Sequence, residues 1–315
     1  MIDHFERNIN YLRISVTDLC NLRCIYCMPE SGVEKLDHAQ ILSIEEIEEI
    51  TIAAAELGIE KIRLTGGEPL VRKDITEIVR RVAAAPGIRE VALTTNGSLL
   101  GAFAKPLKEA GLSRVNISID TMDPEKYRSV TRGGEIGSVL DGIRAAQDAG
   151  LSPIKLNAVL MGGVNEDFIR PLVEMTKDHD FRVRFIEIMP IGECADWNKE
   201  RFVGANRVLE EAPELQYVGT DGVSKLYRME GAKGSVGLIS PISNHFCPTC
   251  NKIRVTSDGK LKPCLHSAEE IPLKGLHGEA LKEAIRQGIL NKPHEHHLSQ
   301  KRRSDSRRGM SAIGG

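Results

Sequence analysis

The sequence predicts an α/β fold, an incomplete (β/α)6 TIM-like barrel followed by a smaller, β-rich C-terminal layer. Strand-like and helix-like segments alternate six times over the first 200 residues. Such alternation favours parallel strands joined by right-handed helical crossovers. After about residue 200 the pattern changes to short β-like pieces. An open, doubly wound sheet would show the same alternation and is the alternative architecture.

Each predicted strand is a short run of β-branched or apolar residues. In chain order these runs span residues 11–16, 61–65, 90–95, 114–120, 154–160 and 182–189. The predicted helices have apolar residues at helical spacing, and several begin at Ser or Asp and end at Gly. They span residues 43–57, 74–84, 98–110, 123–130, 136–149 and 166–178. Ser43 and Glu46 have the spacing of a capping box at the first helix.

Three regions follow from this pattern. Residues 1–200 form the predicted barrel, 201–290 a C-terminal region and 291–315 a basic tail that ends in Gly-Gly. Strand-like pieces at 236–243 and 252–265 mark the C-terminal region, with a hairpin turn at 257–259. The tail is predicted to be either a solvated terminus or a strap across the rest of the molecule.

Composition limits the classes of function. The chain has 315 residues, 41% of them hydrophobic and 27% charged, which is typical of a globular protein. Its net charge of −2 excludes a strong overall attraction to nucleic acid or to an anionic membrane. The sequence lacks an apolar run of the ~18 residues that a membrane span needs, and it has no signal-peptide core. We therefore expect a cytoplasmic protein with neither a nucleic-acid nor a membrane partner.

Seven cysteines in such a protein indicate metal binding rather than a disulfide scaffold. Cys20, Cys24 and Cys27 directly follow the first predicted strand. Three thiolates this close along one loop can converge on one metal centre. Zinc would need a fourth ligand, whereas a [4Fe-4S] cluster held by three cysteines leaves one iron open for a substrate or cofactor.

The run TDLCNLRCIYC at 17–27 resembles the signature of the radical S-adenosylmethionine (SAM) enzymes. The motif GGEP at 66–69, after the second strand, agrees with that resemblance. In this family three cysteines hold a [4Fe-4S] cluster and SAM chelates its open iron. By motif position, the resemblance implies SAM contacts at Tyr26, Gly67, Ser118 and Met189.

Polar side chains inside the predicted strands point to an anionic ligand. Arg63, Lys155, Asn157 and Arg184 lie within runs that are otherwise apolar. A buried cation is costly unless it is paired, so these residues are candidates to bind a polyphosphate inside the barrel. Alternatively, they point outward between strand and helix and reach water.

A second group comprises Cys247, Cys250 and Cys264. Taken alone, it resembles a zinc ribbon that lacks one cysteine, with His245 or His266 available as a fourth ligand. Together with the first group, it resembles the branch of radical SAM enzymes that cyclises GTP in molybdenum cofactor biosynthesis. That resemblance covers essentially the whole chain.

The resemblance implies a second [4Fe-4S] cluster on Cys247, Cys250 and Cys264 that binds the substrate. It implies that ribose C3′ of GTP is joined to guanine C8, giving 3′,8-cyclo-7,8-dihydro-GTP. By motif position, the GTP contacts fall on Arg13, Lys61, Arg63, Thr94, Lys155, Arg184, Lys252, Ile253 and Arg254. Catalytic roles fall on Arg254, Gly314 and Gly315. An electron donor, a homodimer and a downstream enzyme that forms the cyclic pyranopterin are the further partners implied.

One departure from the family pattern and two alternative functions stand beside this interpretation. After Cys250 the family usually has Asn-Arg-x-Arg, whereas this chain has Lys252 in place of the first arginine. Lysine keeps the charge but loses the bidentate fork. The alternatives are a radical SAM maturase that acts on a peptide and a non-catalytic iron–sulfur or zinc protein.

Overall fold

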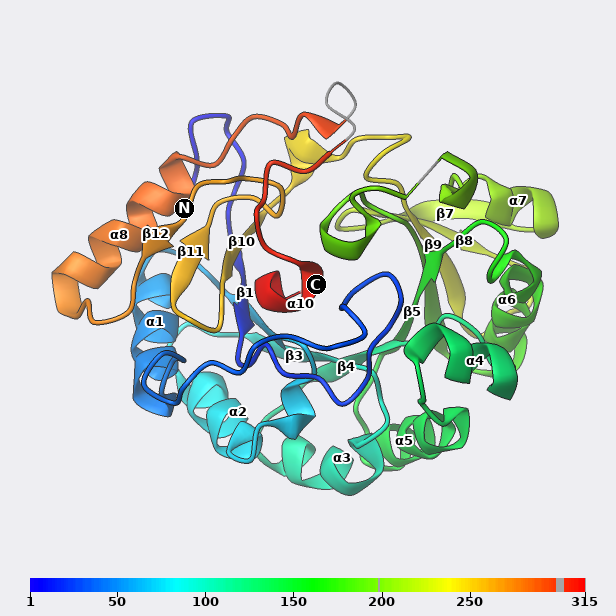
Figure 1. Cartoon of the computed structure of the whole chain (residues 1–315), viewed down its shortest axis with the longest axis horizontal. Coiled ribbons are helices and arrows are strands. Elements are labelled where there is room, and N and C mark those ends of the chain that lie inside the picture. Colours follow the sequence, from blue (N-terminus) through cyan, green and yellow to red (C-terminus); the bar gives the residue numbers. More distant parts are fainter. Residues whose placement is uncertain (198, 299–302, 315) are drawn as a thin grey trace.

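One continuous sheet of twelve strands organises the computed structural model, which describes residues 1–197, 199–298 and 303–314. Six parallel strands form its centre: β1 Tyr11–Ser15, β2 Lys61–Thr65, β3 Glu90–Thr95, β4 Arg114–Ser118, β5 Ile154–Leu160 and β6 Phe181–Glu187. The connecting helices are α1 Ile44–Glu56, α2 Ile75–Ala84, α3 Leu100–Glu109, α4 Pro124–Thr131, α5 Ile136–Asp148 and α6 Ile169–Asp178. The sheet curves, and these helices surround its outer side (Figure 1). The predicted α/β partial barrel is confirmed.

Alternation along the strands separates an apolar face from a polar one. Leu12, Ile14, Ile62 and Leu64 are fully buried in the core between sheet and helices. The residues between them, such as Arg13 and Arg63, therefore point to the concave side of the sheet. The hydrophobic side of each strand holds the barrel together, and its polar side forms the interior.

The C-terminal strands do not form the separate layer that the sequence predicted. They extend the barrel sheet at both of its edges. Beside β6 lies parallel β9 Ser235–Ile239, followed by the antiparallel strands β8 Ser224–Arg228 and β7 Gln216–Asp221. Beside β1 lies parallel β10 Lys252–Val255, followed by β11 Lys260–Lys262 and β12 Ile271–Pro272. A partial barrel leaves unpaired backbone groups on its edge strands, and this pairing satisfies them.

The structure confirms one prediction of local structure and corrects another. The capping box at Ser43 and Glu46 is present. Residues 119–120 and 188–189 were expected to continue strands, but they belong to the loops that follow β4 and β6. These loops carry the residues of the functional site. Short 3-10 turns lie at Pro69–Val71, Glu166–Phe168, Gly192–Cys194, Lys199–Arg201 and Cys247–Thr249.

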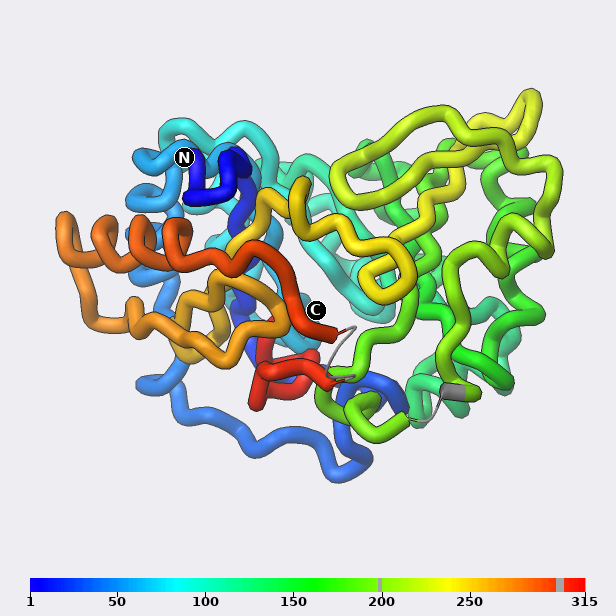
Figure 2. The backbone as a smooth tube through the Cα atoms, turned by 90° about the horizontal axis from the view of Figure 1, so that it is seen from above, coloured from blue at the N-terminus to red at the C-terminus, as the bar shows by residue number. Residues whose placement is uncertain are grey.

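Helices also occur after residue 200. In the described part of this region they are α7 Arg207–Glu211, α8 Gly278–Leu290 and α10 Met310–Ile313. In α8, Leu281, Ile285 and Ile289 recur at helical spacing and are fully buried. Figure 2 shows α8 beside α1 at one side of the molecule, and the C-terminal segment lies in the middle. The described part of the tail therefore crosses the barrel interior as a strap.

Within the described ranges, no helix combines the length and the apolar character that crossing a bilayer requires.

Candidate functional site

The first cysteine group lies on the loop after β1, and the GGEP motif holds the start of this loop. The backbone N–H of Gly67 donates to the carbonyl of Thr17 at 2.9 Å, and that of Glu68 donates to Leu19 at 2.8 Å. A Cβ on Gly67 would lie only 2.4 Å from the carbonyl oxygen of Leu19. Glycine is therefore required at position 67 for the two loops to approach each other.

Glu68 links this motif to the loop after β3. Its side chain is completely buried and accepts hydrogen bonds from Leu70 N–H, Thr95 Oγ1 at 2.8 Å and Asn96 N–H at 2.6 Å. Burial raises the pKa of Glu68 to about 7. The Asn96 side chain in turn donates to Asn21 within the cysteine loop at 2.9 Å. Two strand ends thus fix the position of the loop.

Tyr26 connects the cysteine loop to the other side of the barrel mouth. Its hydroxyl donates to Asp120 at 2.8 Å, two residues after Ser118 at the end of β4. Burial raises the pKa of Asp120 to about 6. The seventh cysteine, Cys194, is buried in the loop after β6 and donates its thiol to the Tyr26 carbonyl at 3.1 Å. Cys194 thus connects the loop after β6, which also carries Met189, to the cysteine loop.

The donor set at the first group suits a metal cluster. Burial raises the pKa of Cys20, Cys24 and Cys27, and neighbouring thiols raise the values of Cys24 and Cys27 further. Three thiolates that repel each other need a cationic centre between them. Among the described residues, no three His, Cys, Asp or Glu side chains are arranged to hold a single metal ion. A cubane cluster does not need that arrangement, because each cysteine binds a different iron.

The barrel interior contains most of the predicted GTP contacts. Arg13 of β1 lies in register with Arg63 of β2 on one side and with Arg254 of β10 on the other. Lys155 of β5 and Arg184 of β6 come from the opposite side of the barrel. Thr94 lies on β3, and Lys252 precedes Arg254 by two residues on β10. The structure therefore brings cations from five strands to one interior.

These cations depress one another's pKa. Burial and nearby arginines lower the pKa of Lys155 to about 7 and that of Lys252 to about 8. For the same reasons, the pKa of Arg184 falls to about 10. Burial also lowers the pKa of Arg254 to about 10, although two nearby cysteines oppose that shift. An anion bound among these groups would offset both the burial and the repulsion.

Polar atoms without partners mark the same interior. Six buried side-chain atoms on its strands make no hydrogen bond within the described parts of the chain: Tyr11 Oη, Arg63 Nε, Thr94 Oγ1, Asn116 Nδ2, Asn157 Oδ1 and Arg184 Nε. A buried polar group left unsatisfied costs about 1–3 kcal/mol. Such a concentration on one surface indicates a site for a polar ligand.

Two of the predicted contacts are placed differently. Ile253 is in register with Leu12, and both are fully buried in the apolar core. Its side chain faces away from the interior, so only its main chain is available to a ligand there. Lys61 begins β2. Its side chain is 44% exposed, and its ammonium nitrogen lies 3.9 Å from the carboxylate of Glu90.

The second cysteine group lies at the opposite end of the barrel from the first. Cys247 and Cys250 come just before β10, which runs parallel to β1, and Cys264 follows the antiparallel strand β11. Lys292 is buried beside them and donates its ammonium group to the carbonyls of Lys252 at 2.8 Å and Pro263 at 3.0 Å.

Cations lie close to Cys250 of this second group. Burial would raise the pKa of Cys250, but Lys292, Lys252 and Arg254 outweigh it and lower that pKa. At Cys247, burial outweighs Lys292 and raises the pKa, so the cations favour the thiolate at Cys250 but not at Cys247. The rings of His245 and His266 each contact His296, with centroids 4.6 and 5.0 Å apart.

Arg308 and Gly314 fix the described tail to the rest of the barrel. The guanidinium of Arg308 forms bidentate pairs with Asp258 at 2.9 Å and with Glu270 at 2.6 and 2.7 Å. Arg254 donates to the carbonyl of Gly314 at 2.7 Å. A Cβ on Gly314 would lie 2.2 Å from Thr65 Oγ1, so this contact requires glycine. Gly315, also predicted as catalytic, lies outside the described residues.

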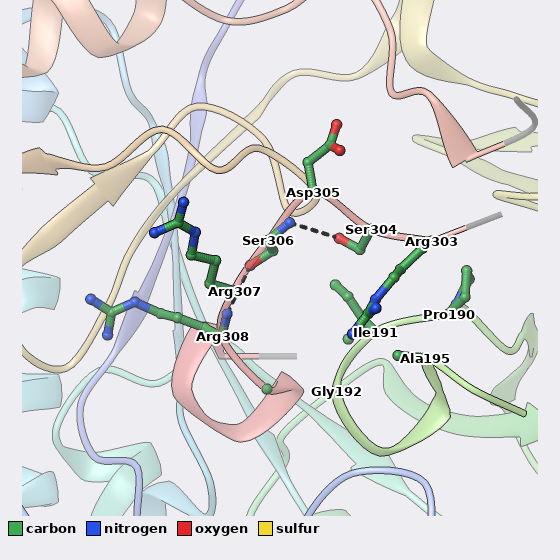
Figure 3. Close-up of a pocket in the computed structure, with 11 residues that line it drawn as sticks. Pro190, Ile191, Gly192, Ala195, Arg303, Ser304, Asp305, Ser306, Arg307 and Arg308 are labelled. Carbon is green, nitrogen blue, oxygen red and sulfur yellow. Dashed lines mark hydrogen bonds between the residues drawn. The ribbon is translucent and has the colours of Figure 1, made fainter. Parts of the chain in front are cut away.

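A pocket of about 250 Å³ separates the tail from the loop after β6. Figure 3 shows Arg303 extending toward Ile191 and Gly192, whereas Arg307 and Arg308 point to the other side of the tail. One wall of the pocket therefore begins at Pro190, the residue that follows Met189, one of the predicted SAM contacts.

Comparisons with known proteins agree with this geometry. The chain matches the model of the radical SAM superfamily over residues 14–176 and that of molybdenum cofactor synthesis C over residues 181–298. It is 51% identical over 320 residues to the GTP 3′,8-cyclase of Alkaliphilus metalliredigens, with 100% of both chains covered. The chain belongs to the GTP 3′,8-cyclase family of radical SAM enzymes. A relative from Peptoclostridium acidaminophilum, also named GTP 3′,8-cyclase, is 50% identical and is covered over 98% of its length, with 100% of this chain.

Solved structures show the same radical SAM fold. Streptococcus suis SuiB bound to S-adenosylmethionine gives a TM-score of 0.65 at 16% identity, covering 93% of this chain and 68% of that chain. The structure of anSMEcpe with bound AdoMet gives 0.54 at 18% identity, covering 90% and 82%. Membership of the radical SAM family implies a [4Fe-4S] cluster and SAM as cofactors. The predicted family and enzyme class are confirmed.

Sequence reasoning missed several polar residues of this radical SAM barrel. Arg114 begins β4 and pairs with Glu90 and with Asn116 Oδ1, the latter at 2.7 Å. Asp221, at the end of β7, pairs with Lys155 and Arg184. The dipeptide Asp221-Gly222 is a hairpin signal, but only the pairing of β7, β8 and β9 brings it to the interior.

Proposed function

We propose that this chain is a GTP 3′,8-cyclase that joins ribose C3′ of GTP to guanine C8 and forms 3′,8-cyclo-7,8-dihydro-GTP in the first step of molybdenum cofactor biosynthesis. The observation that carries the proposal is the barrel interior, where buried cations and unpartnered polar atoms lie between two cysteine groups. This interior needs an anionic ligand with further hydrogen-bonding groups, and a purine nucleoside triphosphate has both.

Two [4Fe-4S] clusters complete the proposed site. Cys20, Cys24 and Cys27 would hold the cluster that binds SAM, and Cys247, Cys250 and Cys264 a second cluster that binds the substrate. When bound, the first cluster and SAM supply a 5′-deoxyadenosyl radical that removes hydrogen from the ribose C3′. The SAM contacts are assigned to Tyr26, Gly67, Ser118 and Met189 at the mouth of the barrel.

The chain itself binds and orients the nucleotide. Arg63, Lys155 and Arg184 would bind the triphosphate, because each is almost fully buried and carries charge toward the interior. Arg13, Thr94, Lys252 and the main chain of Ile253 complete the contacts, and Lys61 contributes from the edge. Holding the phosphates and the guanine at two places fixes the ribose between them, which places C3′ in a near-attack position.

In this proposal the tail covers the interior and supplies catalytic groups. A primary-carbon radical abstracts hydrogen from nearly any group within reach, so the site must exclude water. The described tail crosses the interior, and its Gly314 carbonyl accepts a hydrogen bond from Arg254. We assign catalytic roles to Arg254 and Gly314 for this reason, and to Gly315 because the family pattern implies it.

The remaining parts of the proposal concern partners. The first cluster requires an external electron donor, and the product requires a second enzyme that rearranges it to the cyclic pyranopterin. We place the enzyme in the cytoplasm, as a homodimer, with neither nucleic acid nor a membrane as partner.

An anaerobic assay tests the proposal. Reconstituted and reduced protein is given SAM with GTP, with ATP or with no nucleotide, and both 5′-deoxyadenosine and nucleotide loss are quantified. The proposal predicts that 5′-deoxyadenosine forms with GTP in step with GTP loss, and far less with ATP. Equal slow formation in all three arms would contradict GTP as the substrate, and no formation would contradict the radical SAM activity of this chain.

A further inference from the structure

The turn between β7 and β8 places two polar residues at the phosphate-binding end of the interior. Asp221 and Ser224 close this two-residue hairpin, and Gly222 takes a left-handed φ of +63° within it. Asp221 Oδ2 lies 2.7 Å from Lys155 Nζ, 2.5 Å from Arg184 Nη2 and 3.4 Å from Arg182 Nη1. One carboxylate oxygen therefore serves three cations.

The charges around Asp221 do not balance. A single negative charge faces three positive ones, and two of these, on Lys155 and Arg184, are over 90% buried. A polyphosphate carries several negative charges and offers more oxygens to the same groups. A carboxylate and a phosphate in contact with the same ammonium group would repel each other, so binding of the phosphate displaces Asp221.

Ser224 is oriented differently. Its side chain is 1% exposed, and its hydroxyl has no hydrogen-bond partner among the described residues. A Cβ built on Gly237 would lie 2.3 Å from Ser224 Oγ and 3.2 Å from Arg184 Cγ. The hydroxyl therefore lies beside the Arg184 side chain, and glycine at position 237 makes room for both. It can donate to an oxygen that Arg184 binds.

The turn also has space in which to move. A cavity of about 240 Å³ separates it from the loop that precedes Cys247. Gly222 and Val223 line one side of this cavity, and His245 and Phe246 line the other. Displacing Asp221 therefore does not require the apolar core to be disrupted.

We propose that the β7–β8 turn is a phosphate-binding element in which Asp221 occupies the place of a phosphate group on Lys155 and Arg184 until a polyphosphate displaces it, while Ser224 donates a hydrogen bond to that phosphate. The inference deepens the proposed function, on which it rests for the identity of the substrate. The two residues act with opposite sign, because Asp221 opposes binding and Ser224 supports it.

The test measures equilibrium binding to full-length, cluster-reconstituted protein by calorimetry. The probes are inorganic triphosphate, GTP and guanosine, and the variants are Asp221→Asn and Ser224→Ala. We expect Asp221→Asn to bind triphosphate and GTP about tenfold more tightly and Ser224→Ala to bind them about fivefold more weakly. Guanosine affinity should not change in either variant. The matched control is Asp141→Asn, which removes the same charge from an exposed pair with Arg144 on α5.

Four outcomes would overturn the inference. They are unchanged or weaker triphosphate binding by Asp221→Asn, unchanged binding by Ser224→Ala, an equal gain in Asp141→Asn, and an equal gain for guanosine. If Asp221→Asn does not fold, Ser224→Ala decides alone. Triphosphate binding that changes as expected in a protein that does not consume GTP would support the inference and contradict the proposed function. The reverse pattern would contradict the inference alone.

Discussion

Each of the two cysteine groups contains three cysteines, but Cys24 of the first group and Cys250 of the second lie beside charges of opposite sign. At the first group, the acidic residues Asp120 and Glu68 add to the burial that raises the pKa of Cys24 and Cys20, respectively. At the second, Lys292 and nearby cations lower the pKa of Cys250 in spite of burial. The groups also lie at opposite ends of β1, because one follows that strand and the other precedes its neighbour β10.

This difference indicates what each end of the barrel binds. Acidic neighbours favour a cationic ligand, and SAM carries a sulfonium and an amino group. Cationic neighbours favour an anionic ligand, and a nucleoside triphosphate carries several negative charges. In the proposed function, the radical would therefore be generated at one end of the barrel and the nucleotide held toward the other.

The largest expected effect distinguishes the two groups by activity. Cys24→Ala should reduce 5′-deoxyadenosine formation by about a thousandfold or more, because the cofactor that cleaves SAM is lost. Cys250→Ala should keep slow SAM cleavage but lose GTP consumption. Both products are quantified in one anaerobic assay. Equal loss of SAM cleavage in the two variants would contradict separate roles.

Substitution of Arg254 tests whether its contact with the tail matters for the reaction of GTP. Arg254→Ala removes a buried charge and the hydrogen bond to Gly314, and we expect kcat/KM for GTP to fall about a hundredfold. Arg254→Lys should recover part of this loss, since it keeps the charge but not the fork. A kcat/KM for GTP close to that of the wild type in Arg254→Ala would exclude the residue from the site.

If GTP binds as proposed, we expect Lys155 to make its binding depend on pH. Its pKa of about 7 means that the ammonium group loses its proton as the pH rises above 7, so attraction to the triphosphate weakens. We expect the KM for GTP to rise about fivefold to tenfold between pH 7 and pH 8.5. Lys155→Arg stays charged and should flatten the profile. The idea fails if the variant and the wild type give parallel curves.

Cys194 should show the smallest effect. It lies beside the first group but donates its thiol to the Tyr26 carbonyl, which is the contact of a packing residue. Cys194→Ala should lower the free energy of unfolding by about 1 kcal/mol and leave the iron content unchanged. Denaturant titration and iron analysis measure the two effects. A loss of iron equal to that in Cys24→Ala would make Cys194 a ligand.

Local patterns predicted much of this molecule. The alternating strands and helices, the capping box at Ser43 and the turn at 257–259 depend on nearby residues, and the structure contains all of them. The cation positions Arg63, Lys155 and Arg184 could be found because charges inside apolar strands are costly.

Contacts between strands that are far apart in the sequence could not be predicted in this way. The position of the second cysteine group follows from β10 pairing with β1, more than 200 residues away in sequence. The same pairing turns Ile253 toward the core, since it aligns with Leu12. Asp221 reaches Lys155 only because the exposed hairpin of β7 and β8 adds to the sheet edge at β9. No motif in the sequence specifies these contacts.

The most direct test of two separate cluster sites is metal content. Iron, sulfide and zinc per chain are measured in anaerobically reconstituted wild type and in two variants, one with Cys20, Cys24 and Cys27 changed to Ala and one with Cys247, Cys250 and Cys264 changed. The account predicts about eight irons and eight sulfides in the wild type and about four of each in either variant, without zinc. Four irons and one zinc in the wild type, with the zinc lost in the second variant, would contradict it.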